Sequence, residues 1–227
     1  MDVRRARKRH RILRPEIDED DLSSFPDDLK DELEIRDSLL EGLTLSGSSL
    51  KGLKLVGCVL QSVSWNRVRL EELCIDNCVL RGVDLSNSIV DKADIRRCEF
   101  RDCRLVGLRS RTSSLRDVCF EDCLLDFADF RAIKGNASLA FVSCRLTEAD
   151  FTDADLAGVR FDSCSLIGSS FRDAKARDAD LRGSQLEGIS GITSLRGAIL
   201  STTEALAIMP AVMHELGLDV RNDNEVE

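Results

Sequence analysis

The chain has 227 residues, a formal net charge of -9 and an aromatic content of 4%. No apolar stretch approaches the eighteen or so residues that are needed to cross a membrane, which argues against a membrane-spanning protein. The first fourteen residues carry seven bases, but no apolar segment follows them as it would in a secretory signal. We therefore expect a cytoplasmic protein.

Residues 1–30 form a basic and then acidic segment that precedes any repeat. Seven bases fall in residues 1–14, whereas residues 15–41 carry twelve acids against two bases. Such a composition is typical of a flexible, self-neutralising tail. The alternative is that the basic arm contacts nucleic acid, and we expect no other direct contact with nucleic acid in this chain.

A five-residue period dominates residues 31–200. A bulky apolar residue recurs at every fifth position, and a small or apolar residue stands two positions before it. Neither a helix, with apolar residues about every 3.6 positions, nor an alternating strand has this period. The ladder runs through Ile35, Leu40, Leu45, Leu50, Leu55, Leu60, Trp65, Leu70, Ile75, Leu80, Leu85, Val90, Ile95, Phe100, Leu105, Leu115, Phe120, Leu125 and Phe130, and then, one residue out of step, from Phe141 to Leu186.

Five residues per flat side and four sides per turn give a square coil of about twenty residues, with coils stacked at about 4.8 Å. Within each set of five, the bulky residue and the one two positions before it point inward, while the other three face solvent or form a corner. The sequence therefore predicts an all-β solenoid of about eight coils, built as one elongated domain.

Two irregularities interrupt the ladder. Ser110 places a hydroxyl where the core expects Leu or Phe. The alternatives there are a loosened or looped side and a mere local irregularity, and we favour the irregularity. Between Phe130 and Phe141 there are eleven residues instead of ten, so one extra residue in the region 134–138 should bulge a corner outward.

Seven of the nine cysteines occupy the small inward position. They are Cys58, Cys78, Cys98, Cys103, Cys123, Cys144 and Cys164. Their spacing stacks them in columns, for which packing, disulfides and a metal are the alternatives. In a reducing cytosol a buried cysteine acts as a small hydrophobic residue, so we favour packing and predict no metal or other cofactor. Cys74 and Cys119 should face outward and are the more reactive candidates.

Several of the five-residue units resemble a known motif. They are Ala93-Asp94-Ile95, Ala128-Asp129-Phe130, Ala149-Asp150-Phe151, Ala154-Asp155-Leu156 and Ala179-Asp180-Leu181. These units are similar to the A(D/N)(L/F)xx repeat of pentapeptide-repeat proteins. The resemblance implies a right-handed quadrilateral β-helix, a handedness that the period alone does not give.

Residues 201–227 are predicted to form a C-terminal capping or dimerisation segment. Thr202 or Thr203 can cap a short α-helix, Pro210 can kink it and Gly217 is placed to end it. Its apolar face either covers the open end of the last coil or joins two chains in a homodimer. That face comprises Leu206, Met209, Val212, Met213 and Leu216.

Charge is distributed unevenly along the repeats. Residues 42–120 carry thirteen bases and nine acids, whereas residues 121–227 carry ten bases and nineteen acids. The outward carboxylates of the C-terminal half form either an ordinary solvated surface or one that imitates the phosphates of duplex DNA. The candidate partner-binding residues of such a surface are Asp126, Asp129, Asp150, Asp153, Asp155 and Asp180.

The end of the chain, Leu216-Gly217-Leu218-Asp219-Val220, resembles that of the quinolone-resistance pentapeptide-repeat proteins. The resemblance implies end-to-end dimers that act as DNA mimics, bind DNA gyrase or topoisomerase IV, and modulate the enzyme or protect it from quinolones. The alternative is a rigid protein-protein interaction scaffold with another partner. An enzyme is the least favoured class, because the repeats contain no His, no phosphate-binding glycine-rich loop and no nucleophile elbow.

Overall fold

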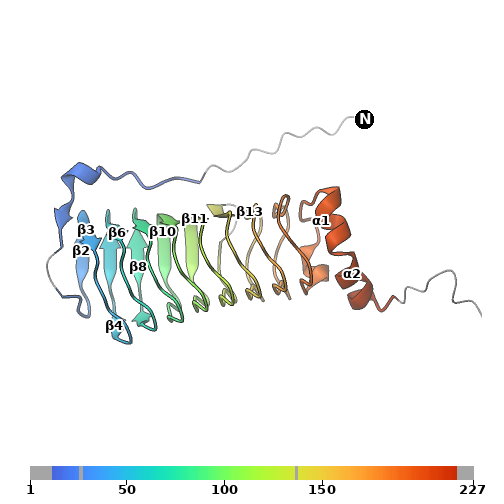
Figure 1. The fold of residues 1–227 in the computed structure, drawn as a ribbon, viewed down its shortest axis with the longest axis horizontal. Helices are drawn as coiled ribbons and strands as arrows, with labels where there is room; N and C mark the ends of the chain where they lie inside the picture. Colours follow the sequence, from blue (N-terminus) through green and yellow to red (C-terminus); the bar gives the residue numbers. More distant parts are fainter. Residues whose placement is uncertain (1–11, 26–27, 136–137, 219–227) are drawn as a thin grey trace, which may run out of the picture.

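The computed structural model describes residues 12–25, 28–135 and 138–218, and it confirms the predicted β-solenoid. Short parallel strands stack coil on coil into an elongated rod, and two short helices close its C-terminal end where we expected one (Figure 1). Regular strands cover about six turns, fewer than the eight predicted. The difference arises because isolated bridges, such as Asp155 to Lys175, join the last coils.

The secondary-structure elements are short. The strands are β1 (Ser23–Ser24), β2 (Glu34–Arg36), β3 (Ser38–Glu41), β4 (Ser49–Lys51), β5 (Lys54–Val56), β6 (Val59–Gln61), β7 (Arg69–Glu71), β8 (Cys74–Asp76), β9 (Val79–Arg81), β10 (Asp94–Arg101), β11 (Ser114–Glu121), β12 (Leu139–Val142) and β13 (Arg160–Asp162). The helices are the 3-10 helices η1 (Glu19–Asp21) and η3 (Ile192–Leu195) and the α-helices α1 (Thr202–Ala207) and α2 (Met209–Leu216).

Strands pair in parallel with the equivalent strand of the next coil, so inward residues form continuous columns. Leu60 pairs with Leu80, and Leu80 with Phe100, each twenty residues further along the chain. Phe120 pairs with Phe141, twenty-one residues further, which confirms that one extra residue is accommodated there. Of the corner predicted to bulge, residues 136 and 137 lie outside the described residues.

The inward side chains form one apolar core along the rod. Phe141 stands between Phe120 and Phe161, with ring centroids 5.0 and 5.1 Å away and nearly parallel planes. Its edge contacts with Phe130 and Phe151, at 5.9 and 6.0 Å, join this column to a second stack of rings. The C-terminal coils are therefore filled by two interlocked columns of phenylalanine.

Ser110 keeps the backbone in register, so no local loop forms there and the irregularity is confined to side-chain packing. Its N–H donates to the Asp129 carbonyl at 2.9 Å within the regular ladder. Its hydroxyl donates to Ser113 Oγ at 3.0 Å, which satisfies the buried polar group locally. The short side chain instead leaves an internal cavity of about 20 Å³, lined mainly by apolar residues that include Val90 and Phe130.

The chain turns between flat sides through residues in the left-handed backbone region. Asn77 (φ 55°) and Asp153 (φ 61°) occupy such corners, as their short polar side chains allow. Phe127 (φ 58°) stands at another corner, and 57% of its surface is exposed. Corner positions therefore present side chains to the surroundings of the rod.

Residues 12–25, which we name the strap, run along the outside of the rod from the level of β11 to its N-terminal end (Figure 1). The strap ends as β1, which pairs in parallel with β3. These residues lie in the segment for which the composition predicts a flexible tail, yet the strap is hydrogen-bonded to the coils. The Leu13 N–H, for example, donates to Asp117 Oδ1 at 3.2 Å.

Candidate protein-interaction surfaces

The six candidate carboxylates are spread over several sides of the rod. Asp129 and Asp150 are bridge partners in adjacent coils. Asp155 lies in a different ladder, between two lysines, and Asp180 lies in a third. The structure therefore brings Asp129 and Asp150 directly together and keeps Asp180 apart from them.

Arginine side chains neutralise two of the candidates. Asp126 is buried, and its carboxylate accepts a hydrogen bond from Arg145 Nε at 2.5 Å. Asp129 accepts from Arg111 Nε at 2.5 Å and from Arg131 Nε at 2.9 Å. Burial raises the pKa of the Asp129 carboxyl above its ordinary value, and the hydrogen bond from Arg111 opposes that shift. Both carboxylates are thus engaged within the rod.

A carboxylate and an arginine two residues apart recur on the strands, because side chains at i and i+2 share a face. Asp180 and Arg182 form such a pair, with hydrogen bonds of 2.8 and 2.6 Å. The same spacing joins Glu34 to Arg36, Asp94 to Arg96, Glu99 to Arg101 and Asp129 to Arg131. This spacing can be read in the sequence, and it shows that the carboxylates of these pairs do not offer isolated negative charge to a partner.

Asp150, Asp153 and Asp155 are less neutralised. Asp153 is exposed at a corner. Asp150 and Asp155 are half-buried, and each accepts a hydrogen bond from the backbone N–H two residues later. Asp150 also lies 3.5 Å from Arg131 Nε. These three side chains place negative charge around one corner of a single coil.

The helices α1 and α2 cover the C-terminal end of the rod (Figure 1). Ser201 is the N-cap of α1 and forms a capping box with Glu204, so the expectation that Thr202 or Thr203 caps the helix was wrong. The predicted single helix is divided at Ile208, because Pro210 begins a new helix. Gly217 ends α2 in the left-handed conformation, as predicted.

Two glutamates of these helices cap backbone N–H groups near the end of the solenoid. Glu204 Oε1 accepts from the Gly183 N–H at 3.0 Å. The Glu215 carboxylate accepts from the three consecutive N–H groups of residues 191–193, at 2.6, 2.9 and 3.3 Å. Neither glutamate stands out by its position relative to the five-residue period, although the Ser201-x-x-Glu204 spacing is a readable capping signal for the first.

These hydrogen bonds change how the two carboxyl groups titrate. A side-chain hydrogen bond with Ser201 lowers the pKa of Glu204 below its ordinary value. Burial raises the pKa of Glu215, but the hydrogen bonds from backbone N–H groups outweigh burial, so this pKa is also lowered. Both glutamates are therefore held in the charged form that the cap requires.

The predicted apolar face of the C-terminal segment divides into a packed part and an exposed part. Val212 packs against the core, and Met213 is half-buried. Ile208, at the break between the helices, is the most deeply buried apolar side chain of the segment. The exposed members of the predicted face are Leu206, Met209 and Leu216, at 66%, 40% and 61% of their surface.

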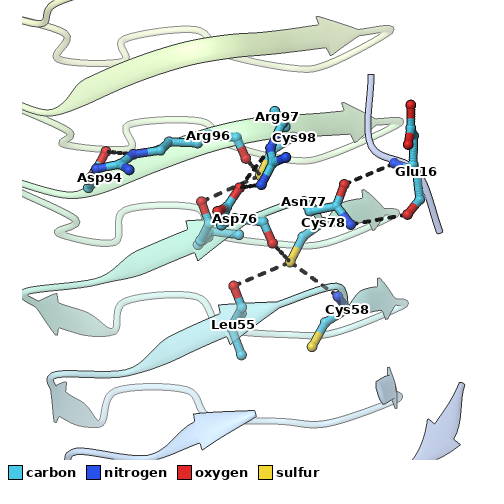
Figure 2. Close-up of polar contacts among 11 residues, drawn as sticks. Glu16, Leu55, Cys58, Asp76, Asn77, Cys78, Asp94, Arg96, Arg97 and Cys98 are labelled. Atoms are coloured by element: carbon cyan, nitrogen blue, oxygen red, sulfur yellow. Dashed lines mark hydrogen bonds and ion pairs between the residues drawn. The ribbon is translucent and has the colours of Figure 1, made fainter. Parts of the chain in front are cut away.

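The stacked cysteines are buried free thiols, which confirms packing over disulfides. Cys78 Sγ donates to the Asp76 carbonyl at 3.3 Å and accepts from the Cys58 N–H at 3.3 Å, so it links two coils (Figure 2). Burial raises the pKa of the outward Cys74, and that of Cys119 to about 11. Burial thus disfavours the thiolate at both sites, and that these two partly exposed thiols are more reactive than the stacked ones stays a prediction.

Among the described residues, no group of three or more His, Cys, Asp or Glu side chains is placed to hold a metal ion. Within that same part of the chain, no helix has the length and apolar character needed to cross a membrane. The basic arm of residues 1–11 lies outside the described residues, so its contact with nucleic acid stays a prediction.

The five-residue units match a known sequence family. The profile described as Pentapeptide repeats matches eight copies, in residues 66–102 and 144–188. Together with the solenoid, this match confirms the resemblance to pentapeptide-repeat proteins. A search of curated protein sequences gave no significant match.

Solved structures with a similar fold include two pentapeptide-type proteins. HetL, a pentapeptide repeat protein involved in heterocyst differentiation regulation from the cyanobacterium Nostoc sp. strain PCC 7120, is 18% identical, with a TM-score of 0.45 over 74% of this chain and 87% of that chain. QnrB1, a plasmid-mediated fluoroquinolone resistance protein, is 19% identical in a trypsin-treated form, with a TM-score of 0.45 over 82% of this chain and 100% of that chain. At these identities and TM-scores neither likeness assigns a fold or a function to this chain.

Proposed function

We propose that this pentapeptide-repeat chain is a non-enzymatic, rigid scaffold that binds protein partners. The observation that carries the proposal is the exposure of Leu206, Met209 and Leu216 on the C-terminal helices. Large apolar side chains that gather on a small exposed module are typical of protein interfaces. The coil ladders and the stacked phenylalanines hold this module on an end of fixed shape, which suits a scaffold.

The partner of the exposed helices is a second copy of the chain, so we expect a homodimer joined through α1 and α2. Light scattering should give about twice the chain mass of 25.2 kDa. Leu206→Asp with Leu216→Asp should give a monomer with unchanged circular dichroism, because charge is costly to bury in an apolar interface. Leu13→Asp, at an exposed leucine of the strap, is the control. A monomeric wild type or a dimeric double variant contradicts this interface.

A second candidate is a DNA mimic that binds DNA gyrase or topoisomerase IV. The arrangement of Asp150, Asp153 and Asp155 around one corner favours it, because closely spaced carboxylates resemble the charge of a phosphate backbone. The purified protein should then alter gyrase supercoiling or its poisoning by quinolones, and changing all three residues to Asn should weaken that effect.

A matched control shows whether the effect on gyrase depends on where the three negative charges lie or only on how many are removed. Asp20→Asn, Asp21→Asn and Asp28→Asn remove the same charge from exposed N-terminal positions and should leave the effect on gyrase unchanged. No effect of the wild type at any reachable concentration excludes the DNA mimic and leaves the scaffold with another partner.

A further inference from the structure

The strap runs over a strip of outward residues that is unusually apolar for a solenoid surface. The strip occupies the position just before the ladder residue on successive coils and consists of Leu39, Val59, Val79, Glu99 and Cys119. Val59 and Val79 point away from the core, yet only 0% and 7% of their surface is exposed. Glu16 is hydrogen-bonded to Asn77 and Glu19 to Arg81, on either side of Val79, so the strap, which runs along the outside of the rod (Figure 1), passes over the strip there.

Two polar side chains beside the strip hold the strap. The Asn77 amide uses both its ends: Oδ1 accepts from the Glu16 N–H at 2.9 Å, and Nδ2 donates to the Glu16 carbonyl at 3.1 Å (Figure 2). Arg81 donates two hydrogen bonds, of 2.9 and 2.5 Å, to the Glu19 carboxylate. The first contact recognises a backbone of any sequence, whereas the second requires a carboxylate.

The spacing of residues along the strap also matches the spacing of the coils. Leu13 contacts Asp117, and Glu16, three residues later, contacts Asn77, two coils away. Three extended residues span about 10 Å, and two coil spacings span about 9.6 Å. An extended peptide can therefore meet the same kind of corner at regular intervals, as the strap does.

We propose that this strip is a peptide-binding surface, covered by the strap in the free protein and taken up by an extended segment of a partner protein when the strap leaves. The partner segment has the chemistry of the strap. It carries a basic residue that pairs with Glu99, as Arg14 does at 3.2 Å, and five residues later a carboxylate that pairs with Arg81, as Glu19 does. Asn77 holds its backbone between these two charges.

The charges of Glu99 and Arg81 determine which partner segment fits the strip, and the solvent exposure of the strap's contacts allows such a segment to replace the strap. The side chains of Arg81 and Glu19 are 34% and 52% exposed, so their ion pair is screened by solvent and weak on its own. The inference deepens the proposed scaffold function by naming a docking surface and the chemistry of its ligand. It does not involve α1 or α2, so its failure leaves the dimer proposal untouched.

Tethering gives the strap an effective concentration in the millimolar range at its own surface. Weakening the strap in cis should therefore raise the apparent affinity for the same sequence supplied in trans. In the full chain, Glu16→Pro removes the N–H that Asn77 binds, and Glu19→Arg reverses the charge that Arg81 binds. Faster amide hydrogen exchange of residues 12–25 should show that the strap of this double variant is open.

The probe is a fluorescent synthetic peptide of residues 12–25, and its binding is followed by anisotropy. The peptide should bind the double variant at least about tenfold more tightly than the wild type. Asp20→Arg, a comparable change at an exposed strap position outside these contacts, should leave binding at the wild-type level. Adding Asn77→Ala to the double variant should abolish binding, with circular dichroism confirming that each variant is folded.

A charge reversal tests the specificity of the surface. A chain with Arg81→Glu should bind a peptide that carries Glu19→Arg and reject the native peptide. The proposal is overturned by equal binding of the native peptide to the wild type and the opened variant, by no binding to the opened variant, or by a strap that stays protected from exchange in it. Each of these outcomes would show that the strip is not a surface on which a partner peptide replaces the strap.

Discussion

Replacing Phe141 with alanine tests whether the stacked rings hold the C-terminal coils together. The ring is fully buried and has four aromatic neighbours with centroids within 6.0 Å. A buried Phe→Ala change costs about 3–5 kcal/mol, and each aromatic pair contributes about 0.5–1.5 kcal/mol beyond its area. Backbone ladders fix the coil spacing and prevent the neighbours from closing the gap, so we expect a loss near 5 kcal/mol.

Equilibrium urea unfolding, followed by far-UV circular dichroism, measures this loss. A loss of that size is a large part of the about 5–15 kcal/mol that stabilises a typical domain. Phe127→Ala is the control, because Phe127 is exposed and alanine meets the same left-handed backbone there. We expect the control to change stability by less than about 0.5 kcal/mol. If Phe141→Ala costs as little, the rigid stacked column does not stabilise the fold.

Two further predictions concern the cavity and the cap. Ser110→Val should raise the free energy of unfolding in urea by about 1 kcal/mol, because valine fills the cavity. Ser113→Val should lower it, because the Ala93 N–H loses its acceptor. A Ser113→Val protein that is more stable than Ser110→Val would contradict this account. Burial raises the pKa of Glu215 and backbone hydrogen bonds lower it, and the net result lies below the ordinary 4.5. The cap therefore stabilises the fold above about pH 4.5, and this contribution is lost as the pH falls through the lowered pKa. After correction for intrinsic rates, amide exchange of residues 191–193 should accelerate as the pH falls through the lowered pKa in the wild type but not in Glu215→Gln. An equal acceleration in both proteins would refute the cap.

The period of the sequence predicted the solenoid because every coil places the same kinds of residue at its inward positions. Each inward residue therefore packs against an equivalent residue twenty positions away in the adjacent coil. The fate of Ser110 was not predictable from that pattern. Whether a buried hydroxyl opens the coil depends on a nearby acceptor, and Ser113 supplies one three residues later. Likewise, helical spacing pointed to one amphipathic helix, but Ile208 anchors the break between two helices.

The strap could not be predicted because its contacts join residues that are far apart in sequence. Glu16 meets Asn77, and Leu13 meets Asp117, without any repeat or motif that links the two partners. One half of the contact was visible, since Val59 and Val79 are apolar at positions that should face solvent. The apolar character of this strip is therefore readable in the sequence, but neither it nor the composition of residues 12–25 identified the strap as a cover.

Flat sides and corners of the rod differ in how they use charge. On a flat side, a carboxylate at i finds an arginine at i+2 on the same face, as Asp94 finds Arg96 in β10, so the charge is largely satisfied within the strand. A corner residue has no such neighbour at i+2, because the chain turns there. Asn77 and Asp117, which hold the strap, and the exposed Asp153 are all corner residues. Corners therefore supply part of the recognition chemistry of this rod, and Arg81 and Glu99 on its strands supply the charged contacts to the strap.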